Sequence, residues 1–177
     1  MAVVETTQAG NPIIRRISEP VTEVNSEEIQ QIIQNLIDSM REQDLVGMAA
    51  PQIEQNLRMF VTEIRETKYR KEGIDSLKVF MNPEIVEKSG EQNTGYEGCG
   101  SVAFAGLFGP VKRSKSVRVK ALDKDGSPFE LEADGLLAVV IQHEADHLDG
   151  ILFIDKVTDT RELMSRNEYL KFRGRDS

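Results

Sequence analysis

The sequence predicts an α+β fold. Segments typical of strands follow one another at 58–64, 78–86 and 115–133, and an apolar segment typical of a buried helix follows at 135–150. Strands that precede a helix in this way, without regular alternation of strand and helix, are typical of α+β proteins. Because 177 residues are enough to build one hydrophobic core, we expect a single domain over 1–177.

The first predicted element is an amphipathic helix at 26–42. Its apolar side chains recur every three or four residues, and Ser26 is a suitable N-cap. The stretch LVGMAAPQI at 45–53 then breaks this period at Gly47 and Pro51, which predicts a turn or an irregular segment.

The central part of the chain predicts strands. RMFVTEI (58–64) and KVFMNPEIV (78–86) are rich in β-branched and aromatic residues. The stretch 115–133 alternates apolar and polar residues on both sides of Asp125 and Gly126, which predicts a hairpin.

Two further helices are expected. The segment 135–150 is apolar as far as residue 141 and ends at Gly150, a residue favoured just after a helix. A C-terminal helix is predicted at about 159–172, with the apolar residues Leu163, Met164 and Leu170.

Composition excludes several classes of function. A net charge of −8 argues against general nucleic-acid binding, which needs a basic surface. No apolar run approaches the roughly 20 residues of a membrane span, and the N-terminus lacks the pattern of a secretory signal. A single cysteine, Cys99, excludes an internal disulfide and is typical of a reducing compartment. We therefore expect a cytoplasmic protein.

The stretch IQHEADHLDG contains the only two histidines, His143 and His147. Residues four apart share one face of a helix, so both rings can point at a common centre, with Glu144 close by. This H-E-x-x-H pattern is typical of two metal ligands and a glutamate that acts as base. The alternative is a pair of hydrogen-bonded histidines beside a solvated glutamate. The spacing and the apolar residues that precede the pair favour the metal site.

A catalytic metal site commonly has three protein ligands, and the chain has no third histidine. An Asp, a Glu or Cys99 remains as the third ligand. A lone cysteine is more often an inert, buried residue. Here Gly98 and Gly100 flank it and allow a close backbone approach, which favours Cys99 as a ligand.

Three segments resemble the signature segments of peptide deformylases. They are GMAAPQ at 47–52, EGCGS at 97–101 and QHEADH at 142–147, compared with the family patterns GxGxAAPQ, EGCLS and QHExDH. They occur in the family's order, and the resemblance covers about residues 10–155.

The resemblance implies a function and a site. It implies hydrolytic removal of the formyl group from the N-formylmethionine of nascent polypeptides, in an α+β fold whose antiparallel sheets surround the HExxH helix. The implied metal is Fe²⁺, for which Zn²⁺, Ni²⁺ or Co²⁺ can substitute. The implied ligands are Cys99, His143 and His147, and the implied general acid and base is Glu144.

Further roles follow from the same resemblance. The side-chain amide of Gln52 and the backbone N–H of Gly100 would stabilise the formyl oxygen. For a family that acts on nascent chains, the basic tail KFRGR (171–175) suggests a transient contact with the ribosome. Apolar residues near these segments are either walls of the methionine pocket or ordinary core residues, and with Gly47 the candidates are Val46, Leu136, Val139 and Val140.

The chain departs from the family pattern in three places. Leu45 stands where the first segment has glycine, and we expect it either to narrow the substrate cleft or to alter strand-like pairing with the peptide. Gly100 stands where the second segment has leucine, and we expect extra backbone freedom there. The stretch 102–110 is unusually apolar, either as a loop whose tip packs on the core or as a changed rim for the peptide beyond methionine or a contact surface. Asp146 is expected either to orient a ligand histidine or to form an ion pair with a base such as Arg113.

Three other functions are considered. The first is a catalytically weakened deformylase relative that binds peptides, which Leu45 and the stretch 102–110 suggest. The second is a zincin-like metallopeptidase, which shares only the HExxH segment and needs a downstream third ligand. The third is a structural metal module, which needs a fourth protein ligand.

Overall fold

The computed structural model describes residues 3–67 and 70–173. It has an α+β fold with two antiparallel sheets, as the sequence predicts. The larger sheet contains, in spatial order, β1 (Gly47–Ala49), β2 (Met59–Ile64), β3 (Asp75–Lys88), β6 (Ser116–Leu122) and β7 (Pro128–Asp134). The smaller sheet contains β4 (Gln92–Gly98), β5 (Leu107–Ser114) and β8 (Met164–Ser165).

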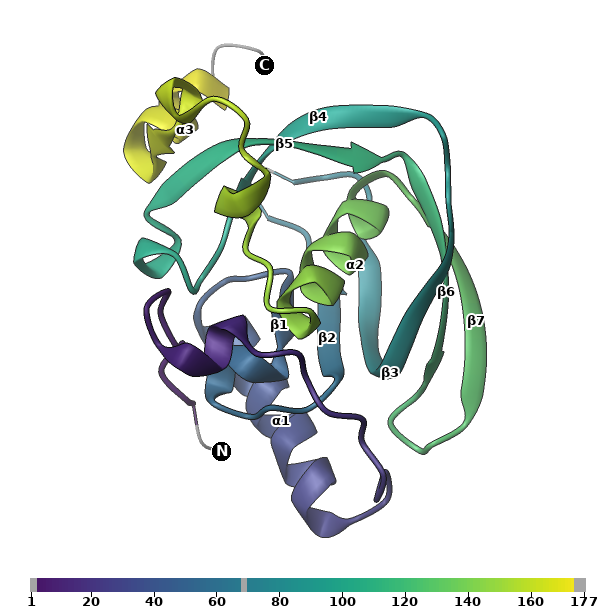
Figure 1. Cartoon of the computed structure of the whole chain (residues 1–177). Coiled ribbons are helices and arrows are strands. Elements are labelled where there is room, and N and C mark those ends of the chain that lie inside the picture. Colours follow the sequence, from purple (N-terminus) through teal and green to yellow (C-terminus); the bar gives the residue numbers. More distant parts are fainter. Residues whose placement is uncertain (1–2, 68–69, 174–177) are drawn as a thin grey trace.

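Helix α2 (Gly135–Leu148) lies in the interior of the molecule and contacts strands of both sheets (Figure 1). It carries the HExxH segment, as predicted, and its apolar first half explains why it can be buried. Asp149 is its C-cap, and Gly150 follows with a φ of +71°. A Cβ at position 150 would lie 2.4 Å from the carbonyl oxygen of Arg15, so only glycine fits this close approach.

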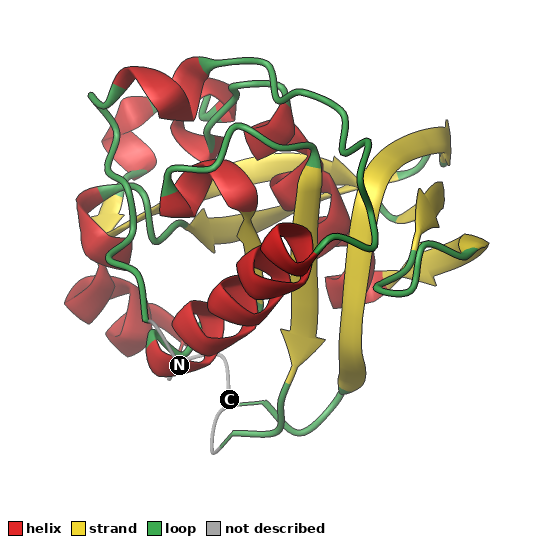
Figure 2. Cartoon of the chain, turned by 90° about the horizontal axis from the view of Figure 1, so that it is seen from below, coloured by secondary structure: helices red, strands yellow, loops and turns green. Residues whose placement is uncertain are grey.

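Helix α1 (Glu27–Glu42) packs across the larger sheet (Figure 2). The predicted cap is present, because the Ile29 N–H donates to Ser26 Oγ at 3.3 Å. Glu27 and Glu28 lie in the first turn, where the positive end of the helix dipole favours acidic residues. The buried face consists of Ile29, Ile32, Ile33, Leu36, Ile37 and Met40.

Strand β2 is buried on both faces because a helix covers each face of the sheet. Met59 and Val61 pack in the cluster that includes α1, whereas Phe60 packs in the cluster that includes α2. Phe60 stacks on Phe80 of β3, with ring centroids 4.6 Å apart. The alternation along β2 thus supplies two separate hydrophobic clusters.

The predicted hairpin at 115–133 is confirmed. Strands β6 and β7 pair from Ser116 with Asp134 to Leu122 with Pro128. Gly126 lies in the connecting turn with a φ of +79°, a value that L side chains rarely adopt.

Two sequence-based predictions were wrong. Residues 45–53 are not irregular throughout, since they form β1 and the 3-10 helix η2 (Ala50–Ile53). The C-terminal helix α3 (Arg166–Arg173) begins later than the predicted 159–172. Leu163 and Met164 lie outside it, and Met164 pairs with Phe108 across the smaller sheet.

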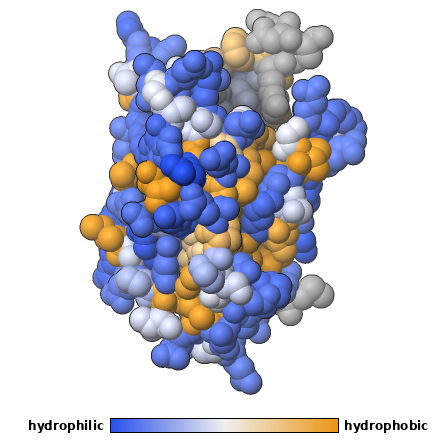
Figure 3. Space-filling view, turned by 90° about the vertical axis from the view of Figure 1, so that its right-hand side faces the viewer, coloured by the Kyte–Doolittle hydropathy of each residue, from blue (hydrophilic) through white to orange (hydrophobic). Residues whose placement is uncertain are grey.

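The face shown in Figure 3 is mostly polar, with small separate hydrophobic areas. Within the described part of the chain, no helix has the length and the apolar character needed to span a membrane.

Candidate active site

Cys99, His143 and His147 lie together in the interior. Cys99 directly follows β4, and the two histidines are one turn apart on α2. Their Sγ atom and ring nitrogens all lie within 4.8 Å of one another. Cys99 Sγ is 3.1 Å from His147 Nε2. The structure thus brings together the three ligands that the resemblance implies.

Gln142 holds this part of α2 against the smaller sheet. Its side-chain oxygen accepts from the Ser114 N–H at 3.1 Å, and its Nε2 donates to the Ser114 carbonyl at 2.9 Å. The amide therefore pairs with the backbone of β5 as a neighbouring strand would. Since His143 is the next residue, this contact helps to position the first histidine.

Glu97, which sequence reasoning did not single out, orients His143. Its Oε2 lies 2.8 Å from His143 Nδ1, and its two oxygens accept from Arg113 at 2.7 and 2.9 Å. Burial alone would raise the pKa of Glu97, but the hydrogen bonds from Arg113 and His143 lower it to about 2. Because the carboxylate is ionised, Nδ1 must be the donor, which leaves the other ring nitrogen of His143 free to bind a metal.

The Cys99 thiol is set up to be a thiolate. Burial alone would raise its pKa, but the neighbouring His147 and His143 lower it to about 5. The thiolate is the form of cysteine that binds metals.

Glu144 lies beside the three donors in a buried position. Only 4% of its surface is exposed, and burial raises its pKa to about 7. In the described part of the chain, its Oε2 has no hydrogen-bond partner. A Cβ at Gly47 would lie 2.5 Å from Glu144 Oε1, so the carboxylate packs directly against the backbone of β1. A carboxylate with a pKa near neutrality can take and return a proton at physiological pH.

Gln52 lies between β1 and the segment that follows Cys99. Its Oε1 accepts from the Ala49 N–H at 2.8 Å, and its Nε2 donates to Ser101 Oγ at 3.2 Å. Nε2 is also 3.7 Å from Cys99 Sγ. Among the described residues, the Gly100 N–H donates to no acceptor. Two groups that can donate hydrogen bonds therefore lie next to the cysteine.

The donor set suits a divalent transition metal. Two imidazoles and a thiolate are ligands that zinc and ferrous iron accept. Three protein ligands, with an unpaired carboxylate oxygen of Glu144 beside them, are typical of a catalytic rather than a structural site.

Asp146 forms ion pairs, one of the two roles expected for it. It accepts from Arg113 and lies 3.2 Å from Lys156 Nζ. Arg113 thereby joins Asp146 to Glu97 in a buried network. Glu97 could have been found from the sequence, because it lies two residues before Cys99 and residues two apart in an extended chain point to the same side.

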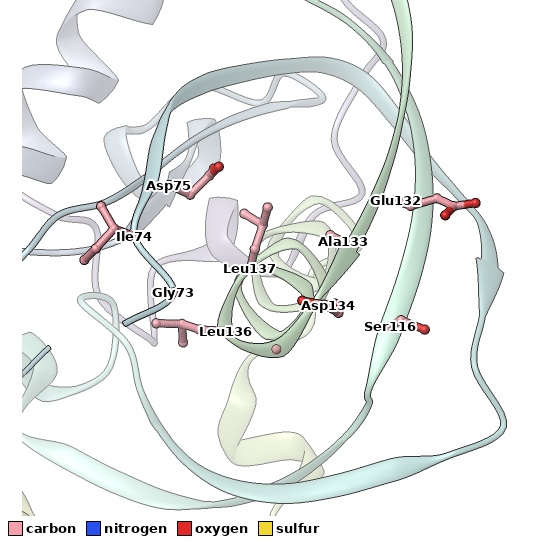
Figure 4. Close-up of a pocket in the computed structure, with 10 residues that line it drawn as sticks. Gly73, Ile74, Asp75, Ser116, Glu132, Ala133, Asp134, Leu136 and Leu137 are labelled. Atoms are coloured by element: carbon pink, nitrogen blue, oxygen red, sulfur yellow. The ribbon is translucent and has the colours of Figure 1, made fainter. Parts of the chain in front are cut away.

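The candidate pocket residues lie in different surroundings. Gly47 borders Glu144, Val140 is buried, and Val46 and Val139 are half-buried. Leu136 is 38% exposed and lines a pocket of about 490 Å³ at the start of α2. Figure 4 shows Leu136 beside Gly73 and Ile74, and a Cβ at Gly73 would lie 3.9 Å from Leu136 Cβ. None of the three candidate metal ligands lines this pocket.

A second pocket, of about 420 Å³, lies beside the segment that follows Cys99. Gly100, the residue after Cys99, forms part of its wall, and Leu45 packs against Gly100 there. The other lining residues are Val3, Val4, Glu5, Thr6, Gln43, Phe104, Ala105 and Arg166.

The stretch 102–110 does not form a loop with its tip packed on the core. It contains the short helix η3 (Ala103–Ala105) and the start of β5. Phe104 is 65% exposed, whereas Phe108 packs over Gly98 and stacks on Tyr169 with ring centroids 4.3 Å apart. Phe104 therefore lines the second pocket, and its role as a rim for the peptide or as a contact surface stays a prediction.

Comparison with known proteins gives a consistent result. The sequence model of the polypeptide deformylase family matches residues 3–162. The class I type b peptide deformylase from Acinetobacter baumannii is 34% identical, with a TM-score of 0.84 over 89% of this chain and 100% of that chain. A structure of the same enzyme with bound Met-Ala-Ser has a TM-score of 0.83 at 34% identity, over 88% of this chain and 99% of that chain.

A peptide deformylase from a second organism has the same fold. The peptide deformylase from Thermotoga maritima is 33% identical, and the match has a TM-score of 0.80 over 90% of this chain and 100% of that chain.

Proposed function

This chain belongs to the polypeptide deformylase family, and on that basis we propose that it removes the formyl group from the N-formylmethionine of nascent polypeptides. The observation that carries the proposal is the position of Glu144, a buried carboxylate with a pKa of about 7 beside three metal-binding donors. The family is a class of enzymes that use a divalent metal.

Cys99, His143 and His147 would hold the metal, and we propose Fe²⁺ as the ion, with Zn²⁺, Ni²⁺ or Co²⁺ as substitutes. When bound, a divalent metal acts as a Lewis acid and makes water available as a nucleophile near neutral pH. A thiolate ligand is compatible with iron and with zinc. Glu97 supports the set by holding His143 Nδ1, as the partners of metal-bound histidines commonly do.

Glu144 is the proposed general base and acid. Its carboxylate takes a proton from the attacking water and passes it to the nitrogen of methionine as the formyl C–N bond breaks. A pKa of about 7 suits both steps, because the group can then gain and lose a proton at physiological pH.

Gln52 and Gly100 are the proposed donors to the formyl oxygen. Negative charge develops on this oxygen when water adds to the formyl carbon, and hydrogen-bond donors that are already in place stabilise it. The Gly100 N–H has no acceptor among the described residues, and the Gln52 amide lies beside Cys99. The Gly100 N–H is therefore free among the described residues, whereas the Gln52 amide, which donates to Ser101 Oγ, would turn a hydrogen from its present partners to the formyl oxygen.

The substrate extends beyond methionine. The Acinetobacter baumannii relative binds Met-Ala-Ser, the peptide that remains after removal of a formyl group from formyl-Met-Ala-Ser. We propose peptides of this kind as substrates, with Val46, Gly47, Leu136, Val139 and Val140 as candidate walls of the methionine pocket. We place the reaction in the cytoplasm.

A transient ribosome contact through residues 171–175 stays a prediction. Gly174 and Arg175 of that tail lie outside the described residues.

The test is formate release. The protein is purified anaerobically, its metal is measured, and formyl-Met-Ala-Ser is compared with acetyl-Met-Ala-Ser. We expect formate only from the formyl peptide. Glu144→Ala should keep its metal and lose turnover, whereas Glu91→Gln, a change at an exposed carboxylate, should behave as wild type.

Other results would favour the other functions. Absence of formate with Fe²⁺, Ni²⁺, Co²⁺ and Zn²⁺, together with retained binding of Met-Ala-Ser, would indicate a relative that only binds peptides. Cleavage of internal peptide bonds would indicate a metallopeptidase. An active Glu144→Ala protein would refute the role of Glu144.

A further inference from the structure

The segment that follows Cys99 adopts a strained conformation. Ala103, Phe104 and Ala105 have φ values of +50°, +52° and +57°. Left-handed backbone is unfavourable for residues with a Cβ, and three in succession are unusual. Such a conformation persists only where the surrounding structure holds it in place. The turn begins next to a candidate metal ligand, so the contacts that hold the turn also fix the backbone beside that ligand.

Gln8 supplies such contacts from the N-terminal segment. Its Nε2 donates to the Gly100 carbonyl at 2.8 Å, and its Oε1 accepts from the Phe104 N–H at 3.1 Å. One side-chain amide thus joins the beginning of the turn to its middle. A third bond, from Nε2 to the Thr6 carbonyl at 2.9 Å, holds the amide in this orientation.

The backbone on either side of Gln8 is fixed to the candidate site. The Thr7 N–H donates to the Gln52 carbonyl at 2.8 Å, and the Ala9 N–H donates to the Ser101 carbonyl at 2.7 Å. The N-terminal segment therefore crosses the site between Gln52 and Ser101, and Gln8 projects from a fixed support.

The turn at 99–105 also sets the direction of the Gly100 N–H. This N–H belongs to the same peptide plane as the Cys99 carbonyl, because a peptide unit is planar. The Cys99 carbonyl accepts from the N–H groups of Val102 at 3.0 Å and Ala105 at 3.1 Å. The next peptide plane carries the Gly100 carbonyl, which Gln8 binds. Both planes that flank Gly100 are thus held, one by the turn and one by Gln8.

We propose that Gln8 is a positioning residue for the reaction. By binding both Gly100 and Phe104, it holds the turn after Cys99 and keeps the Gly100 N–H directed at the developing charge on the formyl oxygen. This inference rests on the proposed function, in which Gly100 is a donor to that oxygen. Gln8 itself need not touch the substrate.

The test uses the full-length, metal-loaded protein. Gln8→Met keeps the size of the side chain and removes its hydrogen bonds, and Gln8→Glu keeps an acceptor for Phe104 but no donor for Gly100 at neutral pH. Gln31→Met on α1 is the matched control, because the Gln31 amide bonds only to Asn35 on the exposed face. Metal content, the absorption spectrum of the Co²⁺ form, kcat and KM for formyl-Met-Ala-Ser, and amide exchange at 100–106 are measured.

We expect Gln8→Met to lower kcat about tenfold, part of the hundredfold or larger loss that removal of an oxyanion donor causes. KM, metal content and the Co²⁺ spectrum should stay unchanged, and amide exchange at 100–106 should become faster. Gln8→Glu places a carboxylate oxygen against the Gly100 and Thr6 carbonyls that Nε2 now binds, so it should lower kcat at least as much as Gln8→Met. Either variant provides the test if the other does not fold. Gln31→Met should match wild type.

Two results would overturn the role of Gln8 alone. The first is an unchanged kcat in both variants of an active protein. The second is a loss of activity that follows a loss of metal or a changed Co²⁺ spectrum, since Gln8 would then act on the metal ligands. Failure of the proposed function looks different, because wild type itself would release no formate with any of the metals, and the role of Gln8 would fall with it.

Discussion

The side chain of Leu45 packs against the backbone of Gly100, so that a Cβ at position 100 would lie 3.0 Å from Leu45 Cδ1. The sequence presents these two residues as separate departures from the deformylase pattern. The structure shows that they form a single packing unit. The φ of Gly100 lies outside the left-handed region, so its backbone conformation does not require glycine. Leu45 favours glycine instead, because its Cδ1 would have to move by a few tenths of an ångström to admit a Cβ at position 100.

This contact predicts coupled effects of substitution. Gly100→Leu should lower the free energy of unfolding by about 1–3 kcal/mol, because the added side chain overpacks the site. The double variant Leu45→Gly with Gly100→Leu should be more stable than the sum of the single effects, by about 1 kcal/mol. Urea unfolding of the three variants and wild type measures this coupling, and strictly additive effects would contradict it.

The close contact between Gly47 and the Glu144 carboxylate predicts a steric limit at position 47. A methyl group at this position would lie 2.5 Å from Glu144 Oε1, so Gly47→Ala must displace the carboxylate. Because a shift of about 1 Å in a catalytic group can cost about a hundredfold in rate, we expect kcat/KM to fall by that order while the metal stays bound. Gly90→Ala, where a Cβ meets no atom within 4 Å, is the control and should be fully active.

The contacts of Glu97 with His143 and Arg113 predict that one substitution will lower both metal affinity and stability. Glu97→Gln weakens the hydrogen bond to His143 Nδ1. It also removes the buried negative charge that pairs with Arg113. We expect the metal to bind about 10–100-fold more weakly and the unfolding free energy to fall by about 3 kcal/mol. Glu91→Gln, which affects only an exposed pair with Lys115, should change stability by less than about 0.5 kcal/mol. Equal effects of the two substitutions would refute the role of Glu97.

The Arg41–Glu63 pair predicts a dependence of stability on pH. Hydrogen bonds from Arg41, at 2.8 and 2.7 Å, lower the pKa of Glu63. A lowered carboxyl pKa contributes stability that is present above the unfolded-state value of about 4.3 and is lost as the pH falls through the folded-state value. Glu63→Gln should therefore be about 0.5 kcal/mol less stable than wild type at pH 7. Urea unfolding should show this difference shrinking below about pH 4, and a constant difference at all pH values would count against the pair.

Local patterns were sufficient for the longer elements and for the pair of histidines on one helix face. Helix α1, the hairpin of β6 and β7, and the buried helix α2 each show their period within a single segment. The smaller sheet was missed because glycine and proline interrupt its alternation, as Gly95 in β4 and Pro110 in β5 do. Strand β1 was missed because its three residues become a strand only by pairing with β2.

The sequence by itself determined the chemistry of this protein: two histidines one helical turn apart, a glutamate beside them and a single cysteine in a glycine-flanked segment. These properties depend on residue type and short spacing, which a linear sequence displays. Only the tertiary structure decided that Glu97 holds His143, that Leu45 packs on Gly100 and that Gln8 holds the turn after Cys99. Those contacts join residues 46, 55 and 92 positions apart, and it is the packing of two sheets around α2 that brings them within hydrogen-bond or van der Waals distance.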